Sequence, residues 1–215
     1  MSNRLYIGNR RYSSWSLRGW LAVKTANLEV EVVTIPLAGG NTPEVKQISP
    51  SGFVPVLEHD GNLVWDSLAI VEYCAELAPL WPADRTARAA ARSVSAEMHS
   101  GFRDLRNDMP MNVCASFPGH GRTPGALADI ARIERLWAEA RTRSGGPFLF
   151  GEFGAADVMF APVTARFATY RPELTAGSEE YCSAVLAHPL VTEWIAGAAA
   201  EPAEWRVARY EPSPD

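Results

Sequence analysis

Hydrophobic and polar positions in the first 80 residues follow two different periods. Four segments alternate or cluster as strands do, namely residues 4–7, 29–34, 54–58 and 63–65. Three segments have helical spacing, namely residues 16–26, 43–48 and a stretch from Asp66 or Ser67 to about Leu77. Asp60-Gly61 is a strong hairpin signal between the last two strands. The expected order is therefore β-α-β-α-β-β-α.

The pattern changes after residue 80, where strand signals vanish and alanine-rich helical spacing takes over. The helices expected in this half cover residues 84–107, 124–143, 155–170, 178–187 and 189–199. Pro79 to Asp84 is proline-rich and polar, as linkers often are. We therefore predict an α/β domain over residues 1–80, a linker starting at 81–86 and an all-α domain over 87–215. The proline-containing tail from Glu201 is expected to lie along the surface.

Composition narrows the class of protein further. The 215 residues carry a net charge of −5, which gives no encouragement to nucleic-acid binding. No apolar run approaches the ~20 residues of a membrane span, and the first residues lack a signal-peptide core, so we expect a cytoplasmic protein without membrane contact. The cysteines at 74, 114 and 182 fit neither a zinc pattern nor a disulfide framework, and the four histidines are scattered. We predict no metal site.

Val54-Pro55 precedes the third expected strand. Proline lacks an N–H group and restricts its neighbour to extended backbone, so its place at a strand start is unusual. If this bond is cis, Val54 exposes its N–H and C=O groups, and an extended peptide could pair with them as an added strand. An ordinary trans proline is the alternative.

Asp66-Ser67 opens the helix that ends near Leu77. A helix start with a hydroxyl and free N–H groups can receive a carboxylate, and Asp66 could accept from an ammonium group of the same ligand. An α-amino-acid head carries both groups. A plain helix cap is the alternative.

The segment Tyr12-Ser13-Ser14-Trp15-Ser16-Leu17-Arg18 joins the first strand to the first helix. Hydroxyl groups at a helix start donate hydrogen bonds without carrying charge, and a donor aimed at sulfur favours thiolate over thiol. Simple capping by serine is the alternative. Ser13 and Ser16 also have the spacing of a Cys-x-x-Cys motif with both thiols replaced, which weighs against disulfide redox chemistry.

Taken together, Ser13-Ser14-Trp15-Ser16-Leu17-Arg18, Val54-Pro55 and Asp66-Ser67-Leu68-Ala69-Ile70 make the chain resemble the cytosolic glutathione S-transferases, with a serine run like that of the zeta and related bacterial classes. The resemblance covers nearly the whole length. It implies a thioredoxin-like α/β domain followed by an all-helical domain, glutathione as co-substrate, a small electrophilic substrate and a homodimer.

The resemblance also implies roles for single residues. Ser13 would hydrogen-bond the glutathione sulfur, with Ser14 as neighbour or substitute, and Asp66 and Ser67 would hold the γ-glutamyl group. Val54, before Pro55, would pair with the cysteinyl backbone of glutathione, and Arg18 matches an arginine at the helix start.

Three departures from the family pattern stand out. Trp15 replaces a cysteine of the zeta pattern, which puts isomerase activity in doubt and could narrow the site. Phe53 replaces a lysine that contacts the glycyl carboxylate in many relatives. Gly154 replaces the usual Ser or Thr of a capping box, in which Asp157 can still accept from the Gly154 N–H.

Met98, Phe102 and Arg106 lie at helical spacing and could line a pocket above the thiol, with Arg106 meeting an electrophile that bears negative charge. Packing in the helix core is the alternative for the apolar members. We therefore expect a glutathione transferase that activates the glutathione thiol. A non-catalytic binding or regulatory protein and a glutathione-dependent isomerase remain the competing hypotheses.

Overall fold

The computed structural model describes residues 3–37 and 42–211. Its first half contains β1 (Arg4–Ile7), α1 (Ser14–Thr25), β2 (Glu31–Thr34), α2 (Pro43–Ile48), β3 (Val56–His59), β4 (Asn62–Trp65) and α3 (Ser67–Leu77). Its second half contains α4 (Arg85–Ser100), α5 (Arg103–Asp108), α6 (Pro124–Ser144), α7 (Ala155–Tyr170), α8 (Ala176–Leu186) and α9 (Pro189–Ala199). Two short 3-10 turns follow, at Ala203–Trp205 and Ala208–Tyr210. The element order predicted for the first 80 residues and the fold class are confirmed.

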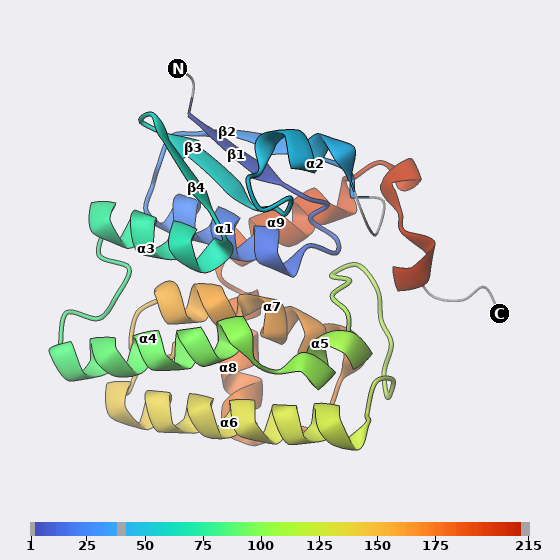
Figure 1. The fold of residues 1–215 in the computed structure, drawn as a ribbon. Coiled ribbons are helices and arrows are strands. Elements are labelled where there is room, and N and C mark those ends of the chain that lie inside the picture. The colour runs from blue at the N-terminus through green and yellow to red at the C-terminus, as the bar shows by residue number, and fades with distance from the viewer. Residues whose placement is uncertain (1–2, 38–41, 212–215) are drawn as a thin grey trace.

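The four strands form one mixed sheet in the order β2-β1-β3-β4. β1 is parallel to β2 and antiparallel to β3, with Leu5 opposite both Val32 and Leu57. Because successive side chains point to opposite faces of a strand, Leu5 packs on the side of α1 and α3, and Tyr6 packs with Val45 of α2 on the other side. Figure 1 shows α1 and α3 between the sheet and the helical half.

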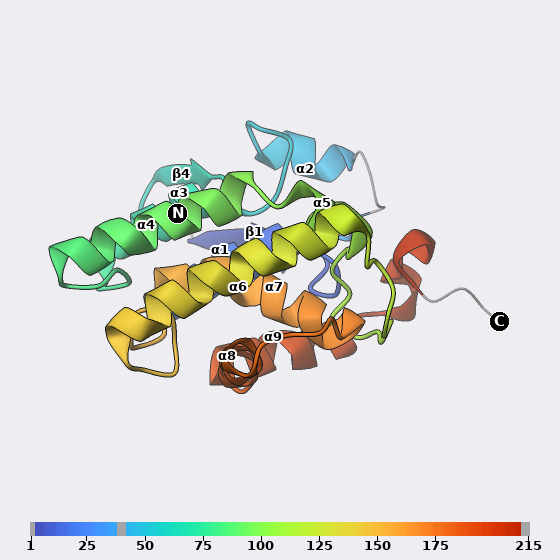
Figure 2. The ribbon, with the colours of Figure 1, turned by 90° about the horizontal axis from the view of Figure 1, so that it is seen from below.

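The second half of the chain packs its helices around α7, whose side chains are almost all buried. Figure 2 shows this half from below, with α6 nearest the viewer and α7 behind it. The prediction of one helix over 84–107 was wrong, because Gly101 ends α4 with extended backbone and Phe102 adopts left-handed dihedral angles (φ 58°, ψ 49°) before α5 begins. After this break, α5 places Arg106 beside Trp15 in the first turn of α1.

The start of α7 is held by the capping box predicted from the sequence. Asp157 accepts hydrogen bonds from the N–H groups of Gly154 and Leu149 and from the hydroxyl of Tyr181, each at 3.0 Å. This carboxylate therefore joins α7, α8 and the loop after α6.

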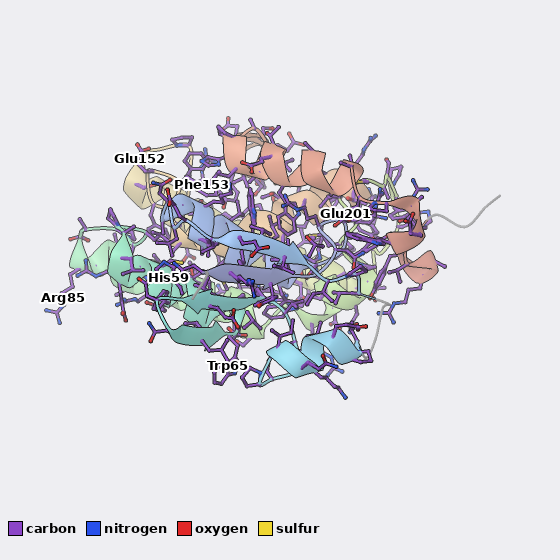
Figure 3. All side chains as sticks on the ribbon, turned by 90° about the horizontal axis from the view of Figure 1, so that it is seen from above. His59, Trp65, Arg85, Glu152, Phe153 and Glu201 are labelled. Atoms are coloured by element: carbon purple, nitrogen blue, oxygen red, sulfur yellow. The ribbon has the colours of Figure 1, made fainter. Side chains whose placement is uncertain are left out.

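The tail from Glu201 lies along the surface, as expected, and it is also fastened by hydrogen bonds to the first loop of the chain. Glu201 accepts hydrogen bonds from the N–H groups of Arg10 and Arg11, and Figure 3 shows it beyond the end of α9. Asn112 donates to the Tyr210 carbonyl at 2.8 Å. Among the described helices, none has both the length and the apolar composition needed to cross a bilayer.

Candidate active site

Three cavities meet at the indole of Trp15, in the first turn of α1. The α1 cavity, about 350 Å³, lies between the start of α1, the helical half and the tail. The Asp66 cavity has about 460 Å³ and the α2 cavity about 500 Å³. Trp15 lines all three, so they are neighbours, and we call the three together the groove. The α1 cavity includes Tyr12, Ser13, Ser14, Arg106, Arg166 and Tyr210; the Asp66 cavity includes Phe53, Val54, Pro55, Trp65, Asp66 and Ser67; the α2 cavity includes Ser13, Lys46, Phe53 and Val54.

Ser13 is the N-cap of α1. Its Oγ accepts from the Ser16 N–H at 3.3 Å, which satisfies one of the free donors at the helix start. The Ser13 hydroxyl also donates to Ser16 Oγ at 2.8 Å, and that oxygen accepts from the Gly8 N–H. The capping alternative is therefore realised at Ser13, and its hydroxyl has protein partners on both sides.

Ser14 is the first residue of α1 and is buried. Its Oγ accepts a hydrogen bond from Arg166 Nη2 at 3.3 Å, across the boundary between the sheet half and the helical half. Arg166 is fixed by two further hydrogen bonds, from Nε to the Met109 carbonyl at 2.9 Å and from Nη1 to the Pro162 carbonyl at 3.1 Å. The guanidinium is therefore held in one orientation toward the start of α1.

Two more arginines flank Trp15. The guanidinium carbons of Arg18 and Arg106 lie 4.9 Å and 5.1 Å from the centroid of its ring, within cation–π range. The His99 ring meets the indole edge-on at 5.2 Å. Burial and the neighbouring cations Arg106 and Arg166 hold the pKa of Arg18 well below its ordinary value. Arg106 lines the α1 cavity, and Arg18 lies buried behind Trp15.

The Val54–Pro55 bond is cis. Among the described residues, no backbone hydrogen bond outside the helices and strands involves Val54, which leaves its N–H and C=O groups available to an extended peptide. Gly19 of α1 lets the helix approach Pro55, since a Cβ atom on Gly19 would lie only 2.7 Å from the Pro55 Cγ atom. The strand expected from residue 54 begins at Val56 instead.

Asp66 caps α3, with its Oδ1 atom accepting from the Leu68 N–H at 2.8 Å. Its φ of 75° is uncommon for a residue other than glycine, and such strained residues cluster at functional sites. Asp66 Oδ2 lies 3.5 Å from His99 Nε2. The Ser67 hydroxyl is buried, lines the Asp66 cavity and has no hydrogen-bond partner within the described part of the chain. A buried donor without a partner is costly, which indicates that a ligand completes this end.

Three residues predicted for the substrate pocket lie elsewhere. Met98 on α4 and Phe102, the residue just before α5, are both buried in the main core, so they do not line the α1 cavity. Arg18 is fully buried one helical turn after Ser14, and its Nε donates to the Met159 carbonyl at 3.0 Å. Of the predicted pocket set, Trp15 and Arg106 line the cavity.

The sequence interpretation missed Tyr12, Arg166 and the tail. The Tyr12 hydroxyl donates to the Glu211 carboxylate and accepts from the Val207 N–H at 3.2 Å. Burial, followed by this hydrogen bond to Glu211, raises the pKa of Tyr12 to about 12. Arg166 had a visible signal, because it is the one cation in a helix that is mostly apolar. No group of three or more histidine, cysteine or acidic side chains is placed to hold a metal ion in the residues described.

Family models identify the class of protein. A model described as Glutathione S-transferase, N-terminal domain, matches residues 12–77, and one described as Glutathione S-transferase, C-terminal domain, matches residues 121–197. The two together cover more than half of the chain. The chain therefore belongs to the glutathione S-transferase family, a class of enzymes that use glutathione as co-substrate.

Individual relatives place the chain within this family. Maleylacetoacetate isomerase of Rattus norvegicus is 29% identical over 177 residues, which span 80% of this chain and 81% of the relative. A probable maleylacetoacetate isomerase of Caenorhabditis elegans is 37% identical over 113 residues, about half of either protein.

Solved structures share the fold. A glutathione transferase homolog from Burkholderia gl BGR1, with bound glutathione, superposes with a TM-score of 0.70 at 23% identity and covers 94% of this chain and 100% of its own. A theta class glutathione S-transferase from Xanthomonas axonopodis pv. citri, also with glutathione bound, has a TM-score of 0.67 at 24% identity, over 90% of this chain and 97% of its own.

Proposed function

We propose that this protein binds glutathione, holds its thiol as a thiolate beside the hydroxyls of Ser13 and Ser14, and adds it to a small electrophile. The observation that carries the proposal is the meeting of these hydroxyls with two guanidinium groups, Arg106 and Arg166, around one cavity. A preorganised site of this kind stabilises negative charge without reorganisation.

Glutathione would lie along the groove from the Asp66 cavity to the α1 cavity. Its γ-glutamyl ammonium group would meet Asp66, and its α-carboxylate would meet the unpartnered Ser67 hydroxyl and the start of α3. The cysteinyl backbone would pair with Val54. Lys46 of α2 lines the next cavity and would meet the glycyl carboxylate in place of the lysine that Phe53 replaces.

The electrophile would enter the α1 cavity, beside Trp15 and the tail. Arg106 lines this space, and its Nη1 atom has no hydrogen-bond partner among the residues described, so it can meet negative charge on the electrophile. We expect the Arg106→Ala variant to lose more activity with anionic than with neutral electrophiles. Equal losses for both would contradict this role.

Formation of the thiolate determines how much free energy the site must supply by binding thiolate more tightly than thiol. Each unit by which the site lowers the thiol pKa corresponds to about 1.4 kcal/mol of preferential thiolate binding. One hydrogen bond to a charged acceptor supplies about 1.5–3 kcal/mol, enough to lower the thiol pKa by one or two units from its ordinary value of about 8.5.

Calorimetric titration with glutathione, followed by conjugation assays across pH, tests the proposal. We expect heat of binding and a conjugation rate that depends on the hydroxyls at the start of α1. A protein that neither binds glutathione nor gains thermal stability at millimolar concentrations would instead be the binding or regulatory protein. Full rate and an unchanged pH profile in both Ser13→Ala and Ser14→Ala would refute the hydroxyl assignment.

A glutathione-dependent isomerase is the second candidate, favoured by the relatives named maleylacetoacetate isomerase. It would use the same thiolate and release glutathione unchanged. Turnover of a maleylacetone-like substrate without consumption of glutathione would identify it.

We also propose a homodimer in the cytoplasm. Phe53, Leu63 and Trp65 are 75%, 40% and 43% exposed around the edge strand β4, and Figure 3 shows Trp65 pointing away from the sheet. This apolar surface could bury itself against a second copy of the chain by two-fold symmetry. Sedimentation of wild type and Trp65→Glu tests the dimer.

The three free cysteines support a reducing compartment, which is consistent with the proposed place in the cytoplasm.

A further inference from the structure

Three neighbouring residues offer hydroxyl hydrogens at the start of α1, and their hydrogen bonds distinguish them. Tyr12 donates its hydrogen to Glu211, and Ser13 donates its hydrogen to Ser16 Oγ. Ser14 Oγ is the acceptor of its bond with Arg166, so the Ser14 hydrogen is not used in that bond. A serine hydroxyl has one hydrogen to donate. Within the described part of the chain, Ser14 is thus the residue of the three whose donor is left for a ligand in the α1 cavity.

Arg166 has an environment that the needs of packing do not explain. Its side chain is 4% exposed, lines the α1 cavity and has no carboxylate within 4.0 Å in the residues described. Its hydrogen bonds go to two carbonyl oxygens and to Ser14. A buried cation without a counter-ion is unfavourable unless a bound anion completes it.

We propose that Ser14, and not Ser13, donates the hydrogen bond to the glutathione sulfur, and that Arg166 is the positioning residue of this donor. By donating to Ser14 Oγ, Arg166 occupies one lone pair and turns the hydroxyl hydrogen toward the cavity. Its positive charge also stabilises the thiolate that forms there. This inference rests on the proposed function and chooses between the two serines that the function left open.

The proton balance of the step is simple. The S–H bond of glutathione breaks heterolytically, the electron pair stays on sulfur, and the proton passes to solvent water. Arg166 cannot take this proton because it is already cationic, and Ser14 keeps its own proton as the hydrogen-bond donor. The pair therefore shifts an equilibrium and forms no covalent bond with the ligand.

The charges around Arg166 come from several elements. Arg106 on α5 adds positive charge, Tyr170 lies on its own helix, and Arg18 on α1 lies nearby. Burial first, and then Arg106, lowers the pKa of Arg166 to about 9, so Arg166 remains protonated at neutral pH. Tyr12, with its pKa raised to about 12, stays neutral and adds no competing anion. Arg209, a further cation, and Tyr210 of the tail also line the cavity.

The test measures the pKa of the bound thiol directly, by titrating the ultraviolet absorption of the thiolate in the protein–glutathione complex. Ser14→Ala and Arg166→Gln should each raise that pKa by about one unit, a tenfold loss of thiolate below the pKa. Arg166→Lys keeps the positive charge but lacks the planar guanidinium group, so it should retain part of the lowering of the thiol pKa. Ser13→Ala should move the pKa much less than Ser14→Ala. Surface variants Ser93→Ala and Arg122→Gln are the matched controls.

Each outcome has a defined meaning. If wild type binds glutathione but its thiol pKa is ordinary, the proposed function fails before this inference is reached. If the wild-type pKa is lowered and Ser13→Ala or Tyr210→Phe raises it while Ser14→Ala does not, the donor assignment is overturned. If Arg166→Gln folds, as judged by circular dichroism, and leaves the pKa unchanged, Arg166 has no such role. Because Ser14→Ala is a small change, the serine comparison decides the donor even if Arg166→Gln does not fold.

Discussion

Each half of α7 buries an ionisable side chain, and the two side chains differ in where their hydrogen-bond partners lie. Asp157 at the start is 1% exposed and accepts three hydrogen bonds, two of them from backbone N–H groups. Arg166, nine residues later, reaches across to Ser14 and lines a cavity. A buried side chain whose hydrogen bonds all lie within its own half of the molecule holds that half together. A buried cation that has no carboxylate beside it among the described residues, and that faces a cavity, fits an anionic ligand.

The largest effect should follow from removing the carboxylate. Asp157→Ala leaves the N–H groups of Leu149 and Gly154 and the Tyr181 hydroxyl without their acceptor, so we expect a loss of about 3–5 kcal/mol in the free energy of unfolding. Urea denaturation measures it. Asp84→Ala, which removes an exposed cap of α4, is the matched control and should cost about 1 kcal/mol. Similar losses in both variants would show that burial of Asp157 is unimportant.

The pH dependence of stability should show the same carboxylate. Burial raises the pKa of Asp157 from 3.8 to about 6. The folded state binds the Asp157 proton more tightly than the unfolded state does. The stabilisation that this bound proton contributes is therefore fully present below pH 3.8 and is lost as the pH rises through about 6. Relative to Asp157→Asn, wild type should lose about 3 kcal/mol across this window. The test compares the free energies of unfolding of both proteins at pH values from about 3.5 to about 7. Parallel curves for the two proteins would contradict the raised pKa of Asp157.

A smaller effect is expected at the start of α1. Ser13→Ala removes the N-cap bond to the Ser16 N–H, and we expect a loss of about 1 kcal/mol in the free energy of unfolding. Thermal and urea denaturation would detect it. If the stability is unchanged and the pKa of the bound glutathione thiol rises, Ser13 acts on the thiol and does not stabilise the helix start.

The smallest effect on stability should come from Arg166. Arg166→Met removes a cation that lacks a counter-ion and fills its space with an apolar side chain, so we expect a change within about 1 kcal/mol in the free energy of unfolding. Conjugation activity should nevertheless fall. A loss as large as that of Asp157→Ala would make Arg166 a second structural charge and remove the contrast between the two ends of the helix.

The sequence predicted the elements well because each depends on local chemistry. The hairpin at Asp60-Gly61, the cap at Asp66 and the capping box at Asp157 are each formed by residues a few positions apart. The break at Phe102 escaped because helical spacing continues across it.

The site was predicted only in part, because its partners come from distant segments. Ser14 and Arg166 are 152 residues apart, and Tyr12 and Glu211 are 199 apart. Periodicity within one segment carries no information about such pairs. Ser13 and Ser14 are adjacent in the sequence, and only their different hydrogen-bond partners separate a cap from a donor.

The fastening of the tail has an evolutionary consequence. Val207, Arg209 and Tyr210 line the α1 cavity, whereas no described residue of the tail lines the Asp66 cavity, which lies between β4, the loop before β3 and the start of α3. Under the proposed function, substitutions at Val207, Arg209 or Tyr210 would therefore change the preference among electrophiles. The contacts proposed for glutathione in the Asp66 cavity would stay the same, so the two preferences can evolve separately.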